Sequence, residues 1–274
     1  MNRPDMSSVG LTAHFTAYAW HLLGVPDAHR FATGRGRLLH LVTSPLRRLA
    51  PALGFADPLH TLLESRHLLL EHVLRREGDR TFVELASGLS PRGTAYSVDS
   101  DILFVEVDLP DMSALKRRLV GNAQGAGQRF VAGDATDPAL YAELAEHVRG
   151  RGPVTVVTEG LNAYLPRAGL EALVHNVAAF LRECGGGRFV LDINPADALR
   201  RFGLFGRLVV GAIQTVARFP VTLPVQSGAD GVNLLESAGF TRIRLHDPRS
   251  HPACSGRDFS GTRGTVLVLE GRME

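Results

Sequence analysis

Four acidic residues lie at or just beyond the ends of short apolar runs in the middle of the chain. Glu84 lies in the run TFVELA and Asp108 ends ILFVEVD, while Asp134 follows RFVA and Glu159 follows VTVVT. In an open α/β sheet, ligands bind beyond the carboxyl ends of the strands, where the strand order reverses. These carboxylates are therefore candidates for holding the polar groups of a ligand.

Asp108 is the candidate for binding a ribose, because an acid after the second strand can accept hydrogen bonds from two ribose hydroxyls. Two alternatives stay open. Asp108 could instead cap a helix that starts at Pro110, and Glu106, one pleat earlier on the same side of the strand, is the fallback ribose ligand. Asp137 fits the cap of the next helix, so Asp134 has no local duty and is expected to accept from an exocyclic amine. Glu159 follows a very apolar strand and needs a partner at that depth.

The loop after the first strand contains Gly88, in the segment ELASGLSPRG. Glycine permits a close backbone approach or a positive φ angle, although a plain turn is the simpler explanation. A nicotinamide-binding fingerprint would also require glycine at positions 86 and 91, which carry alanine and proline. The loop therefore disfavours an NAD site.

Arg66 lies three, four or seven residues from leucines and a valine of its segment, which places it on the apolar stripe of a helix. A guanidinium there requires an anion that can accept two hydrogen bonds. That anion could be an internal carboxylate or the carboxylate of an amino-acid-like ligand. In the second case, the free protein would hold no permanent anion beside Arg66.

These candidates need a sheet to position them, and the chain predicts one. Short apolar runs alternate with helical patterns, which is typical of βαβ units and a parallel sheet. The last two runs are expected to close one edge as an antiparallel hairpin. We therefore expect an α/β fold with a Rossmann-like, seven-stranded, mostly parallel sheet. The expected strands are Thr81–Ala86, Ile102–Asp108, Arg129–Ala132, Val154–Thr158, Arg188–Ile193, Phe240–His246 and Thr265–Glu270.

Helices are expected from Asp57-Pro58 to about Gly78, from Pro110, after Asp137-Pro138, from Pro166 to Cys184, and over Asn233–Ala238. Residues 1–57 are expected to form an N-terminal cap of short helices, which are broken by Pro26, Gly34, Gly36, Pro45 and Pro51. Residues 58–274 are expected to form the cofactor-binding domain. Within that domain, residues 197–232 are expected to form a mostly helical lid insertion with an extended segment, which precedes the last two strands.

Four blocks in this order, ELASGLSPRG, FVEVDLPDMSALKRRL, GDATDP and VTEGLNAYLP, resemble the leucine carboxyl methyltransferase family. The closer likeness is to its bacterial branch of polyketide-pathway O-methyltransferases, and it covers roughly residues 57–195. Members of this family are class I S-adenosylmethionine-dependent methyltransferases. The resemblance implies that S-adenosyl-L-methionine is the cofactor.

The resemblance also assigns roles. Arg66 matches an arginine that holds the methionine carboxylate of the cofactor, and Gly88 matches the glycine of the first loop. Asp108 matches the ribose-binding aspartate. Asp134 and its neighbour Ala135 match the adenine-contacting position, and Glu159 matches a glutamate near the methionine moiety. Glu84, in the first block, is counted with these cofactor-binding residues.

One block departs from the family pattern, in which the first loop usually has a Gly-x-Gly-x-Asp-Thr-Arg run. Here Ala86, Ser90 and Pro91 replace the first glycine, the aspartate and the threonine, while Gly88 and Arg92 remain. No catalytic base is assigned, and Tyr164 is the tentative residue on the substrate side.

Composition narrows the function. The 274 residues carry 30 Lys and Arg against 28 Asp and Glu, which disfavours nucleic acid as a partner. Two distant cysteines favour a reducing, cytoplasmic setting, and histidine spacing predicts no metal site. No membrane partner is expected, and a homodimer is left open.

The expected function is methyl transfer to a carboxylate or hydroxyl oxygen of a small molecule or natural-product intermediate. The alternatives are a non-catalytic S-adenosylmethionine-binding or scaffolding protein and an NAD-dependent dehydrogenase.

Overall fold

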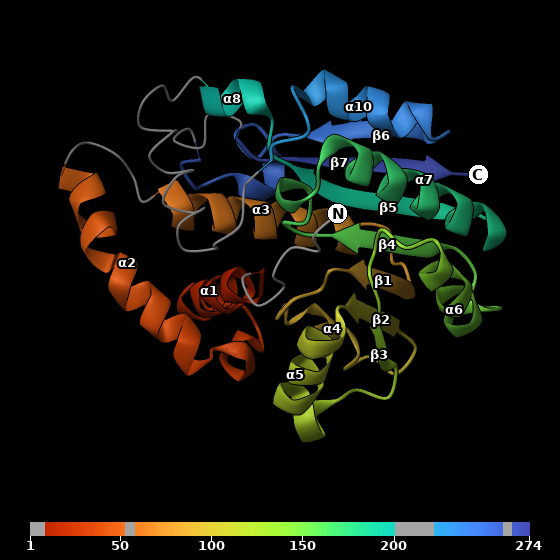
Figure 1. Ribbon diagram of the computed structural model, residues 1–274, viewed down its shortest axis with the longest axis horizontal. Coiled ribbons are helices and arrows are strands. Elements are labelled where there is room, and N and C mark those ends of the chain that lie inside the picture. The colour runs from red at the N-terminus through yellow and green to blue at the C-terminus, as the bar shows by residue number, and fades with distance from the viewer. Residues whose placement is uncertain (1–8, 53–57, 201–221, 260–264) are drawn as a thin grey trace.

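The computed structural model describes residues 9–52, 58–200, 222–259 and 265–274. Its centre is a seven-stranded sheet with the order β3-β2-β1-β4-β5-β7-β6 (Figure 1). The strands are β1 Thr81–Leu85, β2 Leu103–Asp108, β3 Gln128–Ala132, β4 Val154–Thr158, β5 Gly187–Ile193, β6 Thr241–His246 and β7 Leu267–Met273. Within the described ranges, no helix has the length and apolarity needed to cross a membrane.

The first five strands run parallel, and β7 lies antiparallel between β5 and β6. The predicted fold class, including the antiparallel closing pair, is therefore confirmed, and strand ends moved by at most three residues. The strand order reverses between β1 and β4. The carboxyl ends of these two strands thus form the switch point at which open α/β sheets bind ligands.

Helices cover both faces of the sheet (Figure 1). On one face, α6, α7 and α10 pack on residues such as Val83 and Leu85. On the other face, α3 and α4 pack on Phe82 and Phe104. Burial on both faces explains why β1 and β4 are buried along their whole length. The helices are α3 Pro58–Arg75, α4 Arg92–Tyr96, α5 Pro110–Val120, α6 Ala139–Val148, α7 Arg167–Glu183, α8 Ala196–Arg200 and α10 Gly228–Ser237.

The N-terminal region contains α1 (Val9–Leu22), a 3₁₀ turn and α2 (Gly34–Ala52). The expectation of short helices was wrong for α2, because one 19-residue helix continues across Gly36, Pro45 and Pro51. Gly36 serves helix packing: a Cβ there would lie 2.3 Å from the His14 carbonyl oxygen on α1. Glycine therefore lets the two helices approach each other.

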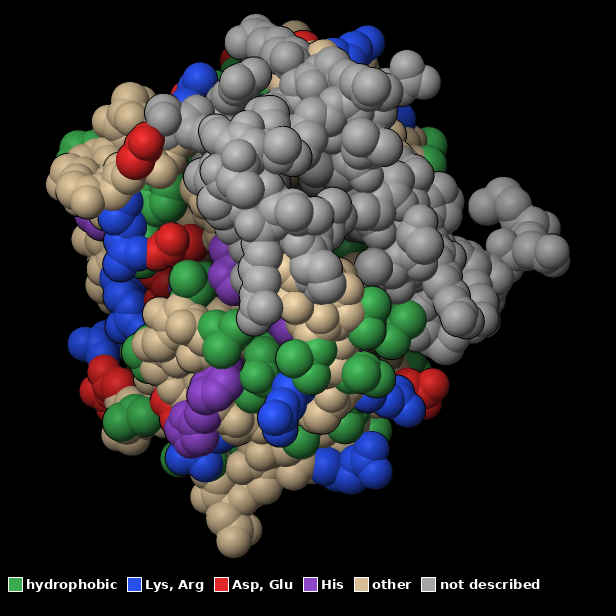
Figure 2. All heavy atoms as spheres, turned by 90° about the vertical axis from the view of Figure 1, so that its left-hand side faces the viewer, with side chains coloured by type: hydrophobic (Ala, Val, Ile, Leu, Met, Phe, Trp, Pro, Cys, Tyr) green, Lys and Arg blue, Asp and Glu red, His purple; other side chains and the backbone are tan. Residues whose placement is uncertain are grey.

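The two N-terminal helices lie at one end of the molecule, and Figure 2 looks onto this end. Ala17 of α1 packs with Leu89 of the first loop and Val120 of α5. On α2, the outward-facing side chains include Leu38, Leu41 and Val42, which are 61%, 59% and 70% exposed. Helix α1 is thus joined to the sheet domain by a small apolar core, whereas α2 presents apolar side chains to solvent. The division into a cap of residues 1–57 and a domain of residues 58–274 stays a prediction.

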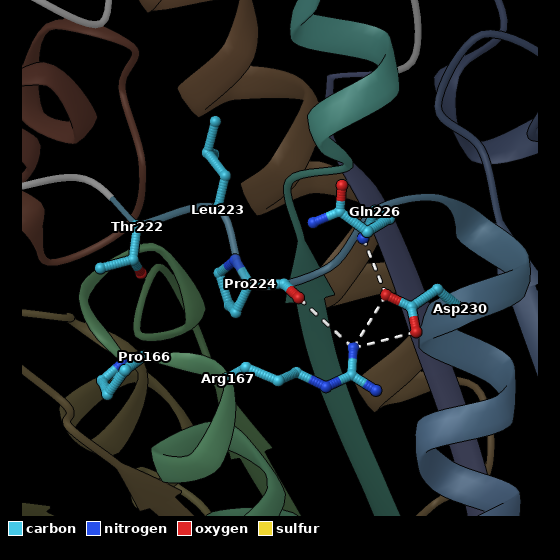
Figure 3. Close-up of a pocket in the computed structure, with 7 residues that line it drawn as sticks. All are labelled: Pro166, Arg167, Thr222, Leu223, Pro224, Gln226 and Asp230. Atoms are coloured by element: carbon cyan, nitrogen blue, oxygen red, sulfur yellow. Dashed lines mark hydrogen bonds and ion pairs between the residues drawn. The ribbon is translucent and has the colours of Figure 1, made fainter.

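The predicted insertion at 197–232 begins in α8, and its residues 201–221 lie outside the described residues. Residues 222–227 are extended, and the insertion ends within α10, which starts at Gly228. Thr222 N–H donates to the Ala163 carbonyl (2.9 Å), and Ala196 N–H donates to the Val225 carbonyl (2.9 Å). Beside it lies an open hollow of about 580 Å³ (Figure 3). Arg167 there donates to both carboxylate oxygens of Asp230, at 2.8 and 2.9 Å.

Helix α10 is longer than expected at its N-terminal end. The prediction placed it at Asn233–Ala238, whereas the structure starts it at Gly228. The Ser227 hydroxyl accepts a hydrogen bond from Asp230 N–H and caps the helix. Gly228 and Gly231 hid this start, because glycine in a first turn weakens the helical pattern of a sequence.

Candidate active site at the carboxyl edge of the sheet

Alternation along the strands sends a set of acids to the same face of the sheet. Successive side chains point to opposite faces, so an acid two residues after a buried apolar residue shares the face of that residue. Phe82, Phe104, Val157 and Val190 all pack under α3 and α4. The acids that follow them on that face are Glu84, Glu106, Asp108, Glu159 and Asp192. Helices α3 and α4 must therefore supply the opposing cations.

Arg66 of α3 supplies one of these cations. Its Nε donates to Glu159 Oε1 at 2.8 Å, and its Nη1 lies 3.6 Å from Asp192 Oδ2. The hypothesis that the free protein holds no permanent anion beside Arg66 was therefore wrong. The reason is that β4 and β5 are neighbours, so their carboxyl ends bring both acids under α3. The prediction that Glu159 needs a partner is confirmed.

Gly160 lies against the Arg66 guanidinium. Its φ angle is +78°, and a Cβ at this position would lie 3.2 Å from Arg66 Nη1. Its N–H donates to Asp192 Oδ1 at 2.7 Å. Glycine is required here both for the left-handed backbone and for the close approach to the guanidinium.

Arg92 of α4 is the second cation, and the sequence analysis gave it no role. The side chain is buried and donates to Glu71 (2.6 Å), to Glu84 (2.7 Å) and to Glu159. His67 Nδ1 lies 3.2 Å from Arg92 Nη2. A guanidinium can only donate, so this nitrogen of His67 accepts. The sequence did contain a signal for this role. Arg92 is retained at the end of the first-loop run, although other positions of that run differ from the family pattern.

The pKa values of the cluster show where charge is favoured. Burial alone would raise the pKa of Glu159, but the Arg92 and Arg66 guanidiniums hold it well below its usual range. Burial raises the pKa of Asp192, and Arg66 with the Gly160 N–H offsets only part of that effect. Glu159 is thus the well-paired carboxylate and Asp192 the poorly paired one.

The first loop and Asp108 form a second part of the site. Ala86 and Gly88 both adopt left-handed φ angles, +51° and +48°. Gly88 N–H donates to Asp108 Oδ2 at 2.6 Å, and Leu109 N–H donates to Oδ1 at 2.8 Å. Burial raises the pKa of Asp108, and these two N–H groups partly offset it. A carboxylate has about four acceptor positions, so Asp108 retains capacity for ligand hydroxyls.

Glu106 is not available as a ribose ligand, so this fallback was wrong. Its carboxylate lies 2.5 Å from Lys116 Nζ and accepts from Gln128 Nε2 at 2.7 Å. The side chain is completely buried beneath Gly93, where even a Cβ would strike it. Lys116 also donates to the Ser87 carbonyl at 3.2 Å, which ties this buried pair to the first loop.

Asp134 is exposed at the end of β3, next to buried Ala135. The expectation that Asp134 has no local duty was wrong, because its Oδ1 accepts from both the N–H and the hydroxyl of Thr136, at 2.9 and 2.8 Å. Short polar side chains commonly bond the backbone two residues ahead. The adenine role of Asp134 stays a prediction.

Tyr164 lies after β4, close to the cluster. Its hydroxyl bonds the Thr12 side chain of α1, and Arg66 and Asp192 act on it electrostatically. Burial raises the pKa of Tyr164, so the phenol stays protonated near neutral pH. This argues against Tyr164 as a general base, and its bond with Thr12 links α1 to the site.

The described residues have the features expected of an S-adenosylmethionine site. Glu84 Oε2 and Asp192 Oδ2 are buried, and neither has a hydrogen-bond partner among the described residues. Asp108 retains free acceptor positions, and two residues of the first loop have the left-handed backbone that glycine favours. Arg66, Asp108 and Glu159 thus lie along the carboxyl edge of the sheet, from the end of β2 to the end of β4. This strand order and edge site define the class I methyltransferase fold.

Comparison with known proteins agrees. Residues 63–178 match the protein family described as leucine carboxyl methyltransferase, which confirms the resemblance found in the sequence blocks. A Mycolicibacterium paratuberculosis protein, provisionally named an S-adenosyl-L-methionine-dependent methyltransferase, is 32% identical over 127 residues. The match covers 45% of this chain and 47% of that protein, so the chain spans about half the length of this relative.

Solved structures support the fold. A Thermobifida fusca protein, provisionally named a methyltransferase, superposes with a TM-score of 0.61 over 94% of both chains at 16% identity. An O-methyltransferase family protein from Burkholderia thailandensis gives a TM-score of 0.52 at 13% identity, over 90% of this chain and 59% of its own. At these identities the likeness establishes the fold alone.

Proposed function

We propose that this protein is an S-adenosylmethionine-dependent methyltransferase that transfers a methyl group to a carboxylate or hydroxyl oxygen of a small molecule. The observation that carries this proposal is the placement of Arg66, Asp108 and Glu159 along one sheet edge, all within the segment that matches the leucine carboxyl methyltransferase family. Oxygen as the acceptor is supported by that family description and by the O-methyltransferase fold neighbour.

Each group at the edge fits one part of this cofactor. Arg66 would hold the amino-acid carboxylate, and Glu159 would lie near the ammonium group. Asp108, held by the Gly88 N–H, would accept hydrogen bonds from the ribose hydroxyls, while Asp134 and Ala135 would contact the adenine. When bound, S-adenosylmethionine supplies a methyl group on a positively charged sulfur.

The chain's own contribution is alignment of the acceptor and exclusion of water. Helix α1 lies over the first loop, and Ala13 is 3.4 Å from the position of a Cβ on Gly88. Tyr164 joins α1 to the end of β4 through Thr12. We propose that α1 and the insertion at 197–232 shape the acceptor site. A carboxylate acceptor would require no base, which suits a site whose tyrosine stays protonated.

Calorimetric titration of the full chain with S-adenosylmethionine, S-adenosylhomocysteine and NAD tests the cofactor class. We expect binding of the first two and none of NAD. A methyl-transfer assay against small carboxylic acids and phenols then tests the acceptor class and separates an enzyme from a non-catalytic binding protein. Binding of NAD alone would overturn the proposal.

A further inference from the structure

Asp192 is a buried acid that the sequence analysis did not single out. Its side chain has no exposed surface, and it lies near the end of β5. One oxygen accepts from Gly160 N–H, whereas the other has no hydrogen-bond partner among the described residues and lies 3.6 Å from Arg66. A buried carboxylate oxygen without a partner is costly. This one therefore requires a functional explanation.

The charges around Asp192 do not balance. Among the described residues, Glu84, Glu159 and Asp192 are three buried carboxylates that face two guanidiniums, Arg66 and Arg92. Glu71 also contacts Arg92 but has its own partner, Arg75, at 3.2 Å. His67 Nδ1 lies 3.7 Å from Glu159, so it is on the Glu159 side of the cluster and not beside Asp192. Within the described part of the chain, these carboxylates outnumber their guanidinium partners by one, and the carboxylate with the weakest pairing is Asp192.

An excess buried anion favours a ligand that brings a cation. S-adenosylmethionine and its product S-adenosylhomocysteine carry the same ammonium and carboxylate groups, and they differ by the methyl group and the positive charge on sulfur. We propose that Asp192 is a specificity-determining residue that favours the cationic methyl donor over its neutral product. This inference rests on the proposed function, because it concerns the same ligand site.

The effect is electrostatic, so it does not require contact with sulfur. In a partly buried site, two charges that are not in contact still interact strongly enough to change a binding ratio by roughly 3- to 30-fold. Asp192→Asn keeps the side-chain volume and the oxygen that accepts from Gly160, and it removes only the charge. Asp99→Asn is the matched control, because Asp99 is exposed and precedes β2 at the opposite edge of the sheet.

The test measures the dissociation constants of S-adenosylmethionine, S-adenosylhomocysteine and sinefungin, an analogue with an amine in place of the methyl sulfonium, for the wild type and both variants. In Asp192→Asn we expect the ratio of the S-adenosylmethionine constant to the S-adenosylhomocysteine constant to rise by roughly 3- to 30-fold. Sinefungin should follow the cationic donor, and Asp99→Asn should leave the ratio unchanged.

Equal weakening of all three ligands, or no change, would overturn the inference, because a structural defect has no preference for charge. Asp192→Glu keeps the charge and must keep the wild-type ratio, and Asp192→Ser offers a second neutral variant if the asparagine variant does not fold. Failure of the wild type to bind either adenosyl ligand would instead overturn the proposed function.

Discussion

Two buried arginines lie at opposite ends of the sheet, and they are bonded very differently. Arg188, at the start of β5, donates to Asp79 (2.7 Å) and to the carbonyls of Val73 and Leu74 (both 2.9 Å), with Glu270 at 3.3 Å. Arg66, at the carboxyl edge, donates one hydrogen bond to a described residue, Glu159, and lies at a longer distance from Asp192.

The difference separates an arginine whose donors are used by described residues from one that we propose holds a ligand. Arg188 uses donors on all three of its nitrogens and satisfies carbonyls in the last turn of α3, where orphan carbonyls need partners. Arg66 has donors left over at a place where the strand order favours ligands. Burial alone, which the two residues share, could not have distinguished them.

The largest expected effect is on stability. Arg188→Met should lower the free energy of unfolding by about 3–5 kcal/mol, because it strands Asp79 and uncaps α3. The matched variant Arg66→Met should lose only about 1–3 kcal/mol, because Glu159 keeps Arg92 as a partner. Urea unfolding of both variants measures the contrast, and equal losses would remove the distinction.

The two ends should also respond differently to acid. At the Arg188 end, burial would raise the pKa of Glu270, but the hydrogen bond with His246 and the Arg76 guanidinium lower it from 4.5 to about 2. A depressed folded-state pKa contributes stability that is present above about pH 4.5 and lost as the pH falls toward 2.

Unfolding free energies of wild type and Glu270→Gln between pH 6 and pH 2 test this. We expect the difference between the two proteins to shrink steadily below about pH 4.5. Asp192 should act in the opposite sense: its raised pKa makes the charged form costly, so protonation as the pH falls stabilises the folded state. A Glu270→Gln difference that stays constant with pH would contradict the assignment.

A smaller effect concerns ribose binding at the site end. Asp108→Ala should weaken S-adenosylmethionine binding by about 1–3 kcal/mol, the range for hydrogen bonds to a charged group. Part of any stability loss will come from the freed Gly88 and Leu109 N–H groups, so affinity, measured by calorimetry on the folded variant, is the relevant quantity. An unchanged dissociation constant would remove Asp108 from the ribose site.

The smallest effect is expected in the first loop. Ala86 has a left-handed φ angle of +51° at the position where the family usually has glycine. Ala86→Gly should therefore raise the free energy of unfolding by about 0.5–1 kcal/mol, because relief of the strain exceeds the added chain entropy. Ala178→Gly, in the middle of α7, is the control and should lower it by about 1 kcal/mol. A loss at both positions would show that Ala86 is unstrained.

The strands could be predicted because apolar runs, turns and helix caps are local signals. The length of α2 could not be predicted, because the reason for a glycine at position 36 is its close contact with α1. That contact is visible only once the two helices are packed together. Within the site, Arg66 could be predicted because a charged residue lies on the apolar stripe of its helix. Glu159 could be predicted because it follows a very apolar strand. Arg92 and Asp192 were missed, because their roles arise where α4 and β5 meet residues distant in sequence. The fallback role of Glu106 failed for the same reason, since its partner Lys116 had not been placed. The bond of Asp134 to Thr136 is local, and the sequence alone could have predicted it.

The central claim is that the carboxyl-edge cluster binds S-adenosylmethionine through Arg66. Calorimetric titration of folded Arg66→Met with S-adenosylmethionine, beside the wild type, tests it most directly. Loss of a charge-assisted hydrogen bond predicts a dissociation constant raised by about tenfold or more. The ligand should then also lose most of its stabilising effect on the melting temperature. A variant that binds S-adenosylmethionine as tightly as the wild type would contradict the claim.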